Sequence, residues 1–177
     1  MAVMLDKIQI NFLAPRPAGF QTENHLIDDT TYWSKTGTAS WDEVVSSVDD
    51  VDGSLWINKN STYHGHFDKI SEEDTKELTT SLYLIRPDNL RIQVGQESQF
   101  RGGTERKVRA LFRYNELPYK LTVTDPAIER AYFRKDDGIY PIREAVVCIS
   151  LSKIIYGHAF KLAASIITRK RVAEANR

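Results

Sequence analysis

The chain has one cysteine in 177 residues and no apolar run that approaches the ~20 residues needed to span a bilayer. A single thiol, Cys148, excludes an internal disulfide, and its apolar neighbours predict a buried core side chain rather than a nucleophile. The first residues lack the basic-then-apolar order of a secretory signal. We therefore expect a cytoplasmic location and no membrane association.

The sequence also lacks the motifs of common catalytic sites. There is no phosphate-binding loop, no dinucleotide-binding glycine pattern, no nucleophile elbow, no zinc-protease motif and no cysteine pair for zinc. His64 and His66, with Asp68 nearby, resemble part of a metal site, but no convincing third ligand accompanies them, and Gly65 between them suggests a flexible loop. We predict no metal, no cofactor and a non-enzymatic function.

The net charge of zero conceals a division of charge along the chain. Residues 1–80 hold 14 acidic and 6 basic residues, a net −8, whereas residues 81–177 hold 10 acidic and 18 basic residues, a net +8. This division is typical either of a polyanionic partner for the second half or of electrostatic docking between the halves. It predicts an acidic N-terminal subdomain over 1–80 and a basic C-terminal domain with a basic tail over 81–177.

Short alternating segments predict strands, and polar or Gly/Pro-rich segments predict the turns between them. The predicted strands are 5–13, 54–57, 81–85, 90–94, 107–114, 119–124, 145–151 and 160–167. A turn at Pro87 predicts that 81–85 and 90–94 pair as a hairpin. Ser40 and Glu43 form a capping box that predicts a helix over 41–49. Asp125 and Pro126 predict the start of another helix over 126–134.

Many short strands and few short helices favour a mainly β fold, built as one or two small OB-like barrels. The 107–124 hairpin is the clearest part of this predicted β structure. Alternation places Val108, Ala110, Phe112 and Tyr114 on one face and Lys107, Arg109, Leu111 and Arg113 on the other. The return strand offers Lys120 to the same cationic face. The sequence therefore predicts an apolar underside and a cationic outer face.

OB barrels bind single strands by combining a cationic groove with aromatic platforms. The hairpin predicts phosphate contacts from Lys107, Arg109, Arg113 and Lys120, and stacking on Tyr114 and Tyr119. Arg101 and Arg106 flank a Gly-Gly loop that could close over a strand. The alternative is that these cations are a solvated outer face and that the tyrosines belong to the core.

A series of segments follows one another in a characteristic order: Gln21 to Asp28, Trp33, Leu55-Trp56, Ser81 to Ile85, Phe112-x-Tyr114, Tyr119 to Pro126, Cys148 to Leu151, Gly157 and Phe160 to Ile167. This ordered set resembles a bacterial and archaeal family of unassigned activity, the dual OB-containing domain proteins. The resemblance implies two OB-type barrels, contact with nucleic acid or a nucleotide, and genes that neighbour defence or nucleic-acid-processing genes. Compared with the family, the chain lacks an upstream strand-rich segment and has Ser152-Lys153 where Gly-Glu is usual. Its first barrel is therefore expected to be incomplete or completed by a partner chain.

Three functions are compatible with these observations. The first is a binding module for single-stranded nucleic acid or a nucleotide. The second is an adaptor whose acidic half docks on a protein partner, such as an effector or nuclease, or on a second copy of the chain. The third is a small nucleotide-processing enzyme in which a buried Asp125–Lys161 pair activates Ser150 or contacts a nucleotide. The alternative to this third function is that Asp125 has a structural role and caps the helix that follows it.

Overall fold

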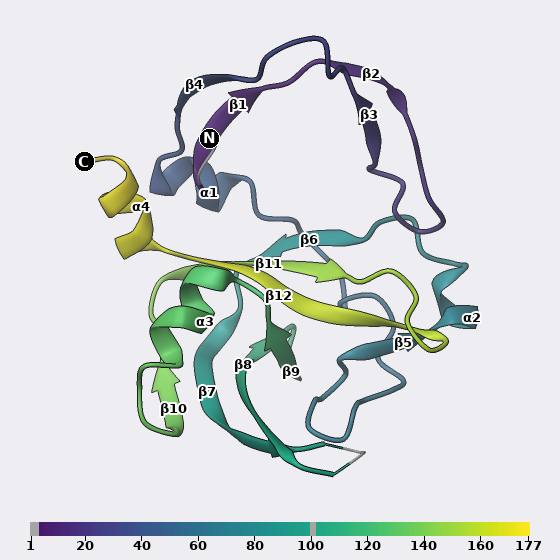
Figure 1. Ribbon diagram of the computed structural model, residues 1–177, viewed down its shortest axis with the longest axis vertical. Coiled ribbons are helices and arrows are strands. Elements are labelled where there is room, and N and C mark those ends of the chain that lie inside the picture. The colour runs from purple at the N-terminus through teal and green to yellow at the C-terminus, as the bar shows by residue number, and fades with distance from the viewer. Residues whose placement is uncertain (1–3, 100–101) are drawn as a thin grey trace.

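The computed structural model describes residues 4–99 and 102–177, which form a mainly β structure with four short helices (Figure 1). The strands are β1 (Asp6–Gln9), β2 (Phe12–Pro15), β3 (His25–Ile27), β4 (Ser34–Thr38), β5 (Lys69–Ser71), β6 (Leu82–Ile85), β7 (Asp88–Ser98), β8 (Thr104–Tyr114), β9 (Leu117–Val123), β10 (Gly138–Pro141), β11 (Ala145–Leu151) and β12 (His158–Thr168). The helices are α1 (Trp41–Ser46), α2 (Glu72–Thr75), α3 (Pro126–Tyr132) and α4 (Arg169–Ala175). None of the helices in the described ranges is long and apolar enough to cross a bilayer.

The largest unit is one sheet, here called the C-terminal sheet, with strand order β10-β7-β8-β9-β12-β11-β6. All its neighbours are antiparallel except β9 and β12, which run parallel at Thr122 and Leu162. Only Arg86 and Pro87 separate β6 from β7, although β6 is last in the order and β7 is second. The sheet must therefore curl so that its two ends come close together.

The inner face of the C-terminal sheet forms the main core. As the alternation predicts, Val108, Ala110 and Phe112 of β8 and Leu121 and Val123 of β9 are buried. Side chains from β7, β11 and β12 complete this interior. Removing this much apolar surface from water is the main stabilising contribution to the fold.

Residues 4–39 form a second region, here called the N-terminal arch. β1 pairs with β4 and β2 with β3, so the chain runs out and back as one interrupted two-stranded ribbon. Figure 1 shows this ribbon spanning the side of the molecule above β6 and β11. At one end Phe20 is buried in the main core and the Glu23 carboxylate accepts a hydrogen bond from the backbone N–H of Ser81. At the other end Ala39 donates to the carbonyl of Leu5.

Residues 66–71, here called the bridging segment, belong to the acidic half of the sequence but fill a gap in the C-terminal sheet. His66 exchanges two backbone hydrogen bonds with Lys120 on β9. β5 then pairs with the first residues of β12, and the Lys161 N–H donates to the carbonyl of Asp68. The bridging segment thus joins β9 to β12 where these strands separate. The division of domains at residue 80 stays a prediction, and this pairing crosses it.

The helix predictions agree with the structure. Ser40 and Glu43 make the reciprocal capping box at the start of α1, which ends at Ser46, three residues before the predicted end. Asp125 caps α3 by accepting from the backbone N–H groups of Ala127 and Ile128. The basic tail forms α4, capped by Thr168.

Two strand predictions are wrong. The predicted hairpin between 81–85 and 90–94 does not form, because β6 pairs with β11 and β7 pairs with β8 and β10. Pro87 disfavours the helical conformation in Arg86, so the chain continues instead of reversing. The predicted strand at 54–57 is irregular instead. There Leu55 and Trp56 are both buried, Trp56 has a φ of 55°, and its indole N–H donates to the carbonyl of Thr80.

Candidate nucleic-acid interface

A row of side chains crosses the outer face of the C-terminal sheet from β7 to β9. Arg91 lies opposite Leu111, and Leu111 lies opposite Lys120. Side chains at directly opposed positions of antiparallel strands point to the same face. The same register adds Pro141 of β10 beside Arg91, and a backbone bridge adds His66 beside Lys120. The row therefore carries cations at two points with an apolar residue between them.

The row lies in a groove of about 700 Å³, here called the cationic groove. Its cations come from three strands and from the segment after β10: Arg91, Arg113, Lys120 and Arg143. Leu111, Pro118, Pro141 and Ile142 give it an apolar lining. No carboxylate of a described residue lines it. The groove therefore combines several positive charges with a floor that can contact sugars or bases.

The cations of the groove have no carboxylate partner at ion-pair distance among the described residues, although the charge of Lys120 also acts on the Glu97 carboxylate. Across residues 4–99 and 102–177, no ion pair joins Arg91, Lys120 or Arg143 to a carboxylate. The Arg113 guanidinium donates to the backbone carbonyl of Glu116, which orients the side chain without cancelling its charge. Converging uncompensated cations attract anions, and guanidinium groups match phosphate oxygens in geometry.

Arg113 and Lys120, two of the residues singled out from the hairpin sequence, both line the cationic groove. Arg91 and Arg143 were missed. A sequence signal did exist for Arg91, because Leu90, Ile92 and Val94 alternate with it and predict that it faces outward. Its place beside Lys120 required the strand order. Nothing in the sequence pattern singles out Arg143, which is brought to the groove by the course of the chain after β10.

Arg109, predicted from the alternation to contact phosphates, does not line the cationic groove. Its side chain is on the outer face of β8 but only 8% exposed. It donates to both carboxylate oxygens of Glu97, at 2.9 and 2.6 Å, and to Thr122. Asp68 of the bridging segment lies 3.8 Å away. Although burial acts to raise the pKa of Glu97, Arg109 lowers it, so the pair stays charged and the guanidinium is occupied.

The other predicted cations also have partners. Arg106 donates to Asp137 and to the backbone carbonyls of Phe133 and Lys135. Lys107 pairs with Glu105 at 2.8 Å. The Arg106 contacts tie β8 to the segment after α3, the Lys107 contact stays within β8, and both cations have a carboxylate partner. Arg101 lies outside the described residues.

The predicted stacking platforms are core residues. Tyr119 is 2% exposed, and its hydroxyl accepts hydrogen bonds from the Leu55 N–H and the Asn58 amide. The Tyr114 hydroxyl accepts from the Val51 N–H. Both rings therefore face the interior and fasten the segment 51–58 to the sheet. The alternative interpretation of the tyrosines as core residues is correct.

The structure does not pair Asp125 with Lys161. Asp125 caps α3 and accepts from the Arg171 guanidinium at 2.6 Å and from the Ile166 N–H at 3.0 Å. Burial acts to raise the pKa of Asp125, but these donors outweigh it and lower the pKa. Ser150 is a half-buried residue of β11, paired opposite Leu82 and Leu162. Asp125 is therefore committed to a structural role, and the proposed activation of Ser150 loses its basis.

Lys161 is an inward-facing residue of β12 and is 1% exposed. Its ammonium donates to the Ile57 carbonyl at 3.0 Å and to the Asn58 side-chain oxygen at 2.5 Å. Burial lowers the pKa of Lys161 to about 7, and the nearby Asp68 carboxylate acts in the opposite direction. The lysine therefore anchors the segment 57–58 to the interior of the sheet.

Gly65 is required by a close approach rather than by flexibility. A Cβ at this position would lie 1.7 Å from the Asp68 carboxylate, which accepts from the Thr62 N–H at 2.6 Å. His64 contacts the backbone carbonyl of Ser98 through Nε2. Within the part of the chain that the structure describes, no group of three or more His, Cys, Asp or Glu residues could hold a metal ion.

Comparison with protein families assigns the chain. The family model described as the dual OB-containing domain matches residues 1–166. The chain belongs to the dual OB-containing domain family. None of the curated proteins and none of the solved structures compared with it matches. Membership covers both the N-terminal arch and the C-terminal sheet, so both regions are parts of one family domain.

Proposed function

We propose that this chain is a non-enzymatic OB-type binding module that holds single-stranded nucleic acid in the cationic groove. The observation that carries the proposal is the set of four cations, Arg91, Arg113, Lys120 and Arg143, which share one groove without a carboxylate among the described residues. A polyanion would supply the missing charge partners. Phosphates spaced along an extended strand suit cations distributed over three neighbouring strands.

The strand order supports an OB barrel as the frame of this site. β6 and β7 together act as a first strand that bends at Pro87, with β8, β9, β11 and β12 as the second to fifth. The parallel contact between β9 and β12 then joins the third and fifth strands, and β11 returns to β6. OB barrels bind oligonucleotides over the face of their second and third strands. The cationic groove lies on that face of β8 and β9.

The residues of the groove indicate which part of a nucleic acid is recognised. Phe112 and Tyr119 are buried, so apart from the half-buried His66 ring the groove offers prolines, Leu111 and Ile142 rather than exposed aromatic side chains. Stacking on an aromatic ring contributes ~1–3 kcal/mol per base in other single-strand binders. With one half-buried ring in the lining, binding rests mainly on phosphates and depends little on base identity. A free nucleotide, with its phosphates at one point, would engage fewer of the cations.

The test is fluorescence anisotropy of a labelled twelve-residue oligothymidylate at low salt. The wild type is expected to bind, and Arg91→Glu to weaken binding at least ten-fold, because the change replaces an attraction by a repulsion at one of the two cations of the row. Lys170→Glu is the matched control. It makes the same charge change on α4, where the Lys170 side chain is 85% exposed.

Two results would overturn the proposal: no binding by the wild type at low salt, or equal losses in Arg91→Glu and Lys170→Glu. Circular dichroism of both variants separates lost binding from lost folding. Competition by unlabelled thymidine monophosphate distinguishes a strand from a nucleotide, since a nucleotide site would be blocked by the monomer at a concentration similar to that of the oligomer.

A further inference from the structure

The N-terminal arch exposes more apolar surface than its own fold accounts for. Phe20 is its one buried hydrophobic residue among residues 4–39. Large apolar side chains are exposed along both halves of the ribbon: Met4, Phe12, Leu13, Leu26, Ile27, Tyr32 and Trp33. An isolated two-stranded ribbon is marginally stable in water at best. Exposed apolar surface concentrated in one segment is typical of an interaction site.

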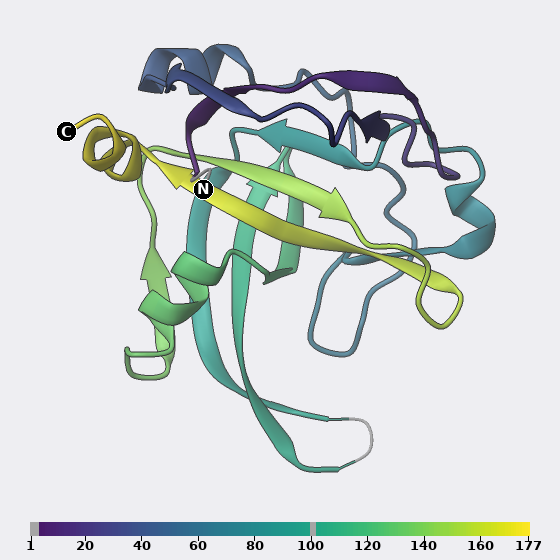
Figure 2. The same cartoon turned by 45° about the horizontal axis from the view of Figure 1, so that its top comes forward.

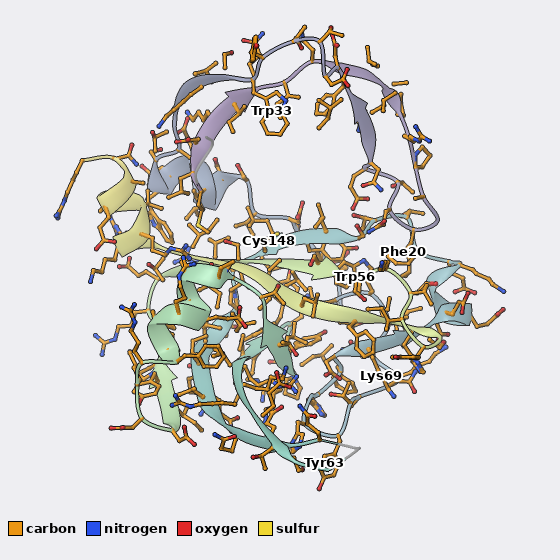
Figure 3. All side chains as sticks on the ribbon, in the orientation of Figure 1. Phe20, Trp33, Trp56, Tyr63, Lys69 and Cys148 are labelled. Atoms are coloured by element: carbon orange, nitrogen blue, oxygen red, sulfur yellow. The ribbon has the colours of Figure 1, made fainter. Side chains whose placement is uncertain are left out.

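A groove of about 690 Å³ lies in the arch. Ile8, Ile27, Tyr32 and Trp33 supply its apolar lining, and Trp33 is 53% exposed. Figure 3 shows the Trp33 ring within the span of the arch, on the side toward the C-terminal sheet. The outer edges of the ribbon strands pair with no other described strand, so their backbone groups are available to an added segment.

The charges around this groove determine what it can accept. Lys35 pairs with Asp6 at 2.6 Å, which leaves Asp29 as the uncompensated charge of the lining. α1 begins directly after the arch, and residues 40–52 contain five acidic and no basic residues. This excess of negative charge is unfavourable for a polyanion such as nucleic acid. The Asp29 carboxylate lines the groove together with the exposed rings of Tyr32 and Trp33. A Lys or Arg side chain suits this arrangement, because its charge can pair with the carboxylate while it lies over a ring.

From this arrangement we propose that the arch groove docks an extended, positively charged segment of another protein. A Lys or Arg of that segment contacts Asp29 and the Trp33 ring, and its aliphatic residues cover Ile8 and Ile27. The surface is distinct from the cationic groove, which lies on the outer face of β7, β8 and β9. The two grooves have no lining residue in common, and Figure 2 shows β7 and β8 running away from the arch. One chain would then hold a nucleic acid and a protein on separate surfaces of opposite charge.

The experiment selects random octapeptides displayed on phage against the immobilised full-length chain. Before the selection, the phage library is depleted of peptides that bind the Trp33→Ala variant. Enriched peptides are expected to be rich in Lys and Arg with interleaved aliphatic residues. Anisotropy of a labelled enriched peptide is then expected to show at least ten-fold weaker binding to Trp33→Ala and to Asp29→Lys.

Matched controls are Tyr156→Ala, which removes a 93% exposed aromatic side chain elsewhere, and Glu77→Lys, which makes the same charge change on an exposed acidic residue. Both should bind the peptide as the wild type does. The proposal is overturned if no peptide is enriched, if enriched peptides are acidic, or if the controls lose as much affinity as Trp33→Ala. It is also overturned if sedimentation shows that the wild type is a dimer and Trp33→Ala a monomer, since a second copy of the chain then occupies the groove. An Arg91→Glu variant should still bind the peptide, which separates this proposal from that of the cationic groove.

Discussion

The C-terminal sheet and the N-terminal arch are both built from hydrogen-bonded strands but differ in what those strands bury. Strands β7, β8, β9, β11 and β12 alternate inward and outward and share one core. Those of the arch leave Phe12, Leu13 and Leu26 exposed to solvent. Hydrogen-bonded ribbons are therefore insufficient for stability, and what distinguishes the two regions is a shared apolar interior. The sheet can present a rigid binding face, whereas the arch has surface left for a partner.

The largest expected effect comes from truncating one leucine in each region, a buried one in the C-terminal sheet and an exposed one in the arch. Leu121→Ala in β9 should lower the free energy of unfolding by about 3 kcal/mol, because Leu121 is fully buried and its loss leaves a cavity. Leu13→Ala in the arch should change it by less than about 0.5 kcal/mol, since the side chain is 61% exposed. Urea denaturation measures both. Equal losses of unfolding free energy in the two variants would contradict the comparison, because they would mean that Leu13 contributes to stability as much as a core residue does.

The connection between the two halves of the sequence can be broken at Gly65. Gly65→Ala should destabilise the protein by about 2 kcal/mol, because the new Cβ displaces the Asp68 carboxylate and leaves buried donors without a partner. Gly37→Ala in the arch is the matched control, since its Cβ would meet only the Lys7 Cδ at an ordinary 3.7 Å. A similar melting temperature for the two variants would contradict the account of the bridging segment.

The buried Lys161 makes the stability of the C-terminal sheet depend on pH. Its pKa is about 7 in the folded chain and 10.5 in the unfolded chain, so above pH 7 the unfolded chain binds more protons. The free energy of unfolding should therefore rise with pH, by about 1 kcal/mol per unit between pH 7 and 8.5. Below pH 7 Lys161 is protonated in both the folded and the unfolded chain, so the free energy of unfolding no longer changes with pH through this residue. Lys161→Met should abolish this rise. Urea denaturation at several pH values measures it, and the same dependence of the unfolding free energy on pH in the wild type and in Lys161→Met would contradict the prediction.

Local patterns in the sequence predicted the elements of the sheet well. The alternation of Val108 to Tyr114, the capping box at Ser40 and the cap at Asp125 each depend on a few adjacent residues, and the structure confirms them. The pairing of β6 with β11 could not be predicted in this way. It depends on which strands meet after the sheet curls, and Pro87 had indicated a turn.

The candidate site was only partly predictable for the same reason. Arg109 and Arg113 look alike in the alternation, but the partners of Arg109, Glu97 and Asp68, come from β7 and from the bridging segment. Arg91 joins Lys120 only through two cross-strand registers. A sequence shows which residues face outward. Which of the outward cations remain without a carboxylate is decided by contacts between distant segments.

The most direct test of the central claim is the salt dependence of oligothymidylate binding. Each phosphate neutralised on a single strand contributes about −0.7 to the slope of log Kobs against log salt concentration. If four cations of the groove contact phosphates, the wild-type slope should be about −3, and the double variant Arg91→Ala with Arg113→Ala should reduce it to about −1.5. A wild-type slope near zero, or a slope that the double variant leaves unchanged, would contradict the assignment of the cationic groove as a phosphate-binding surface.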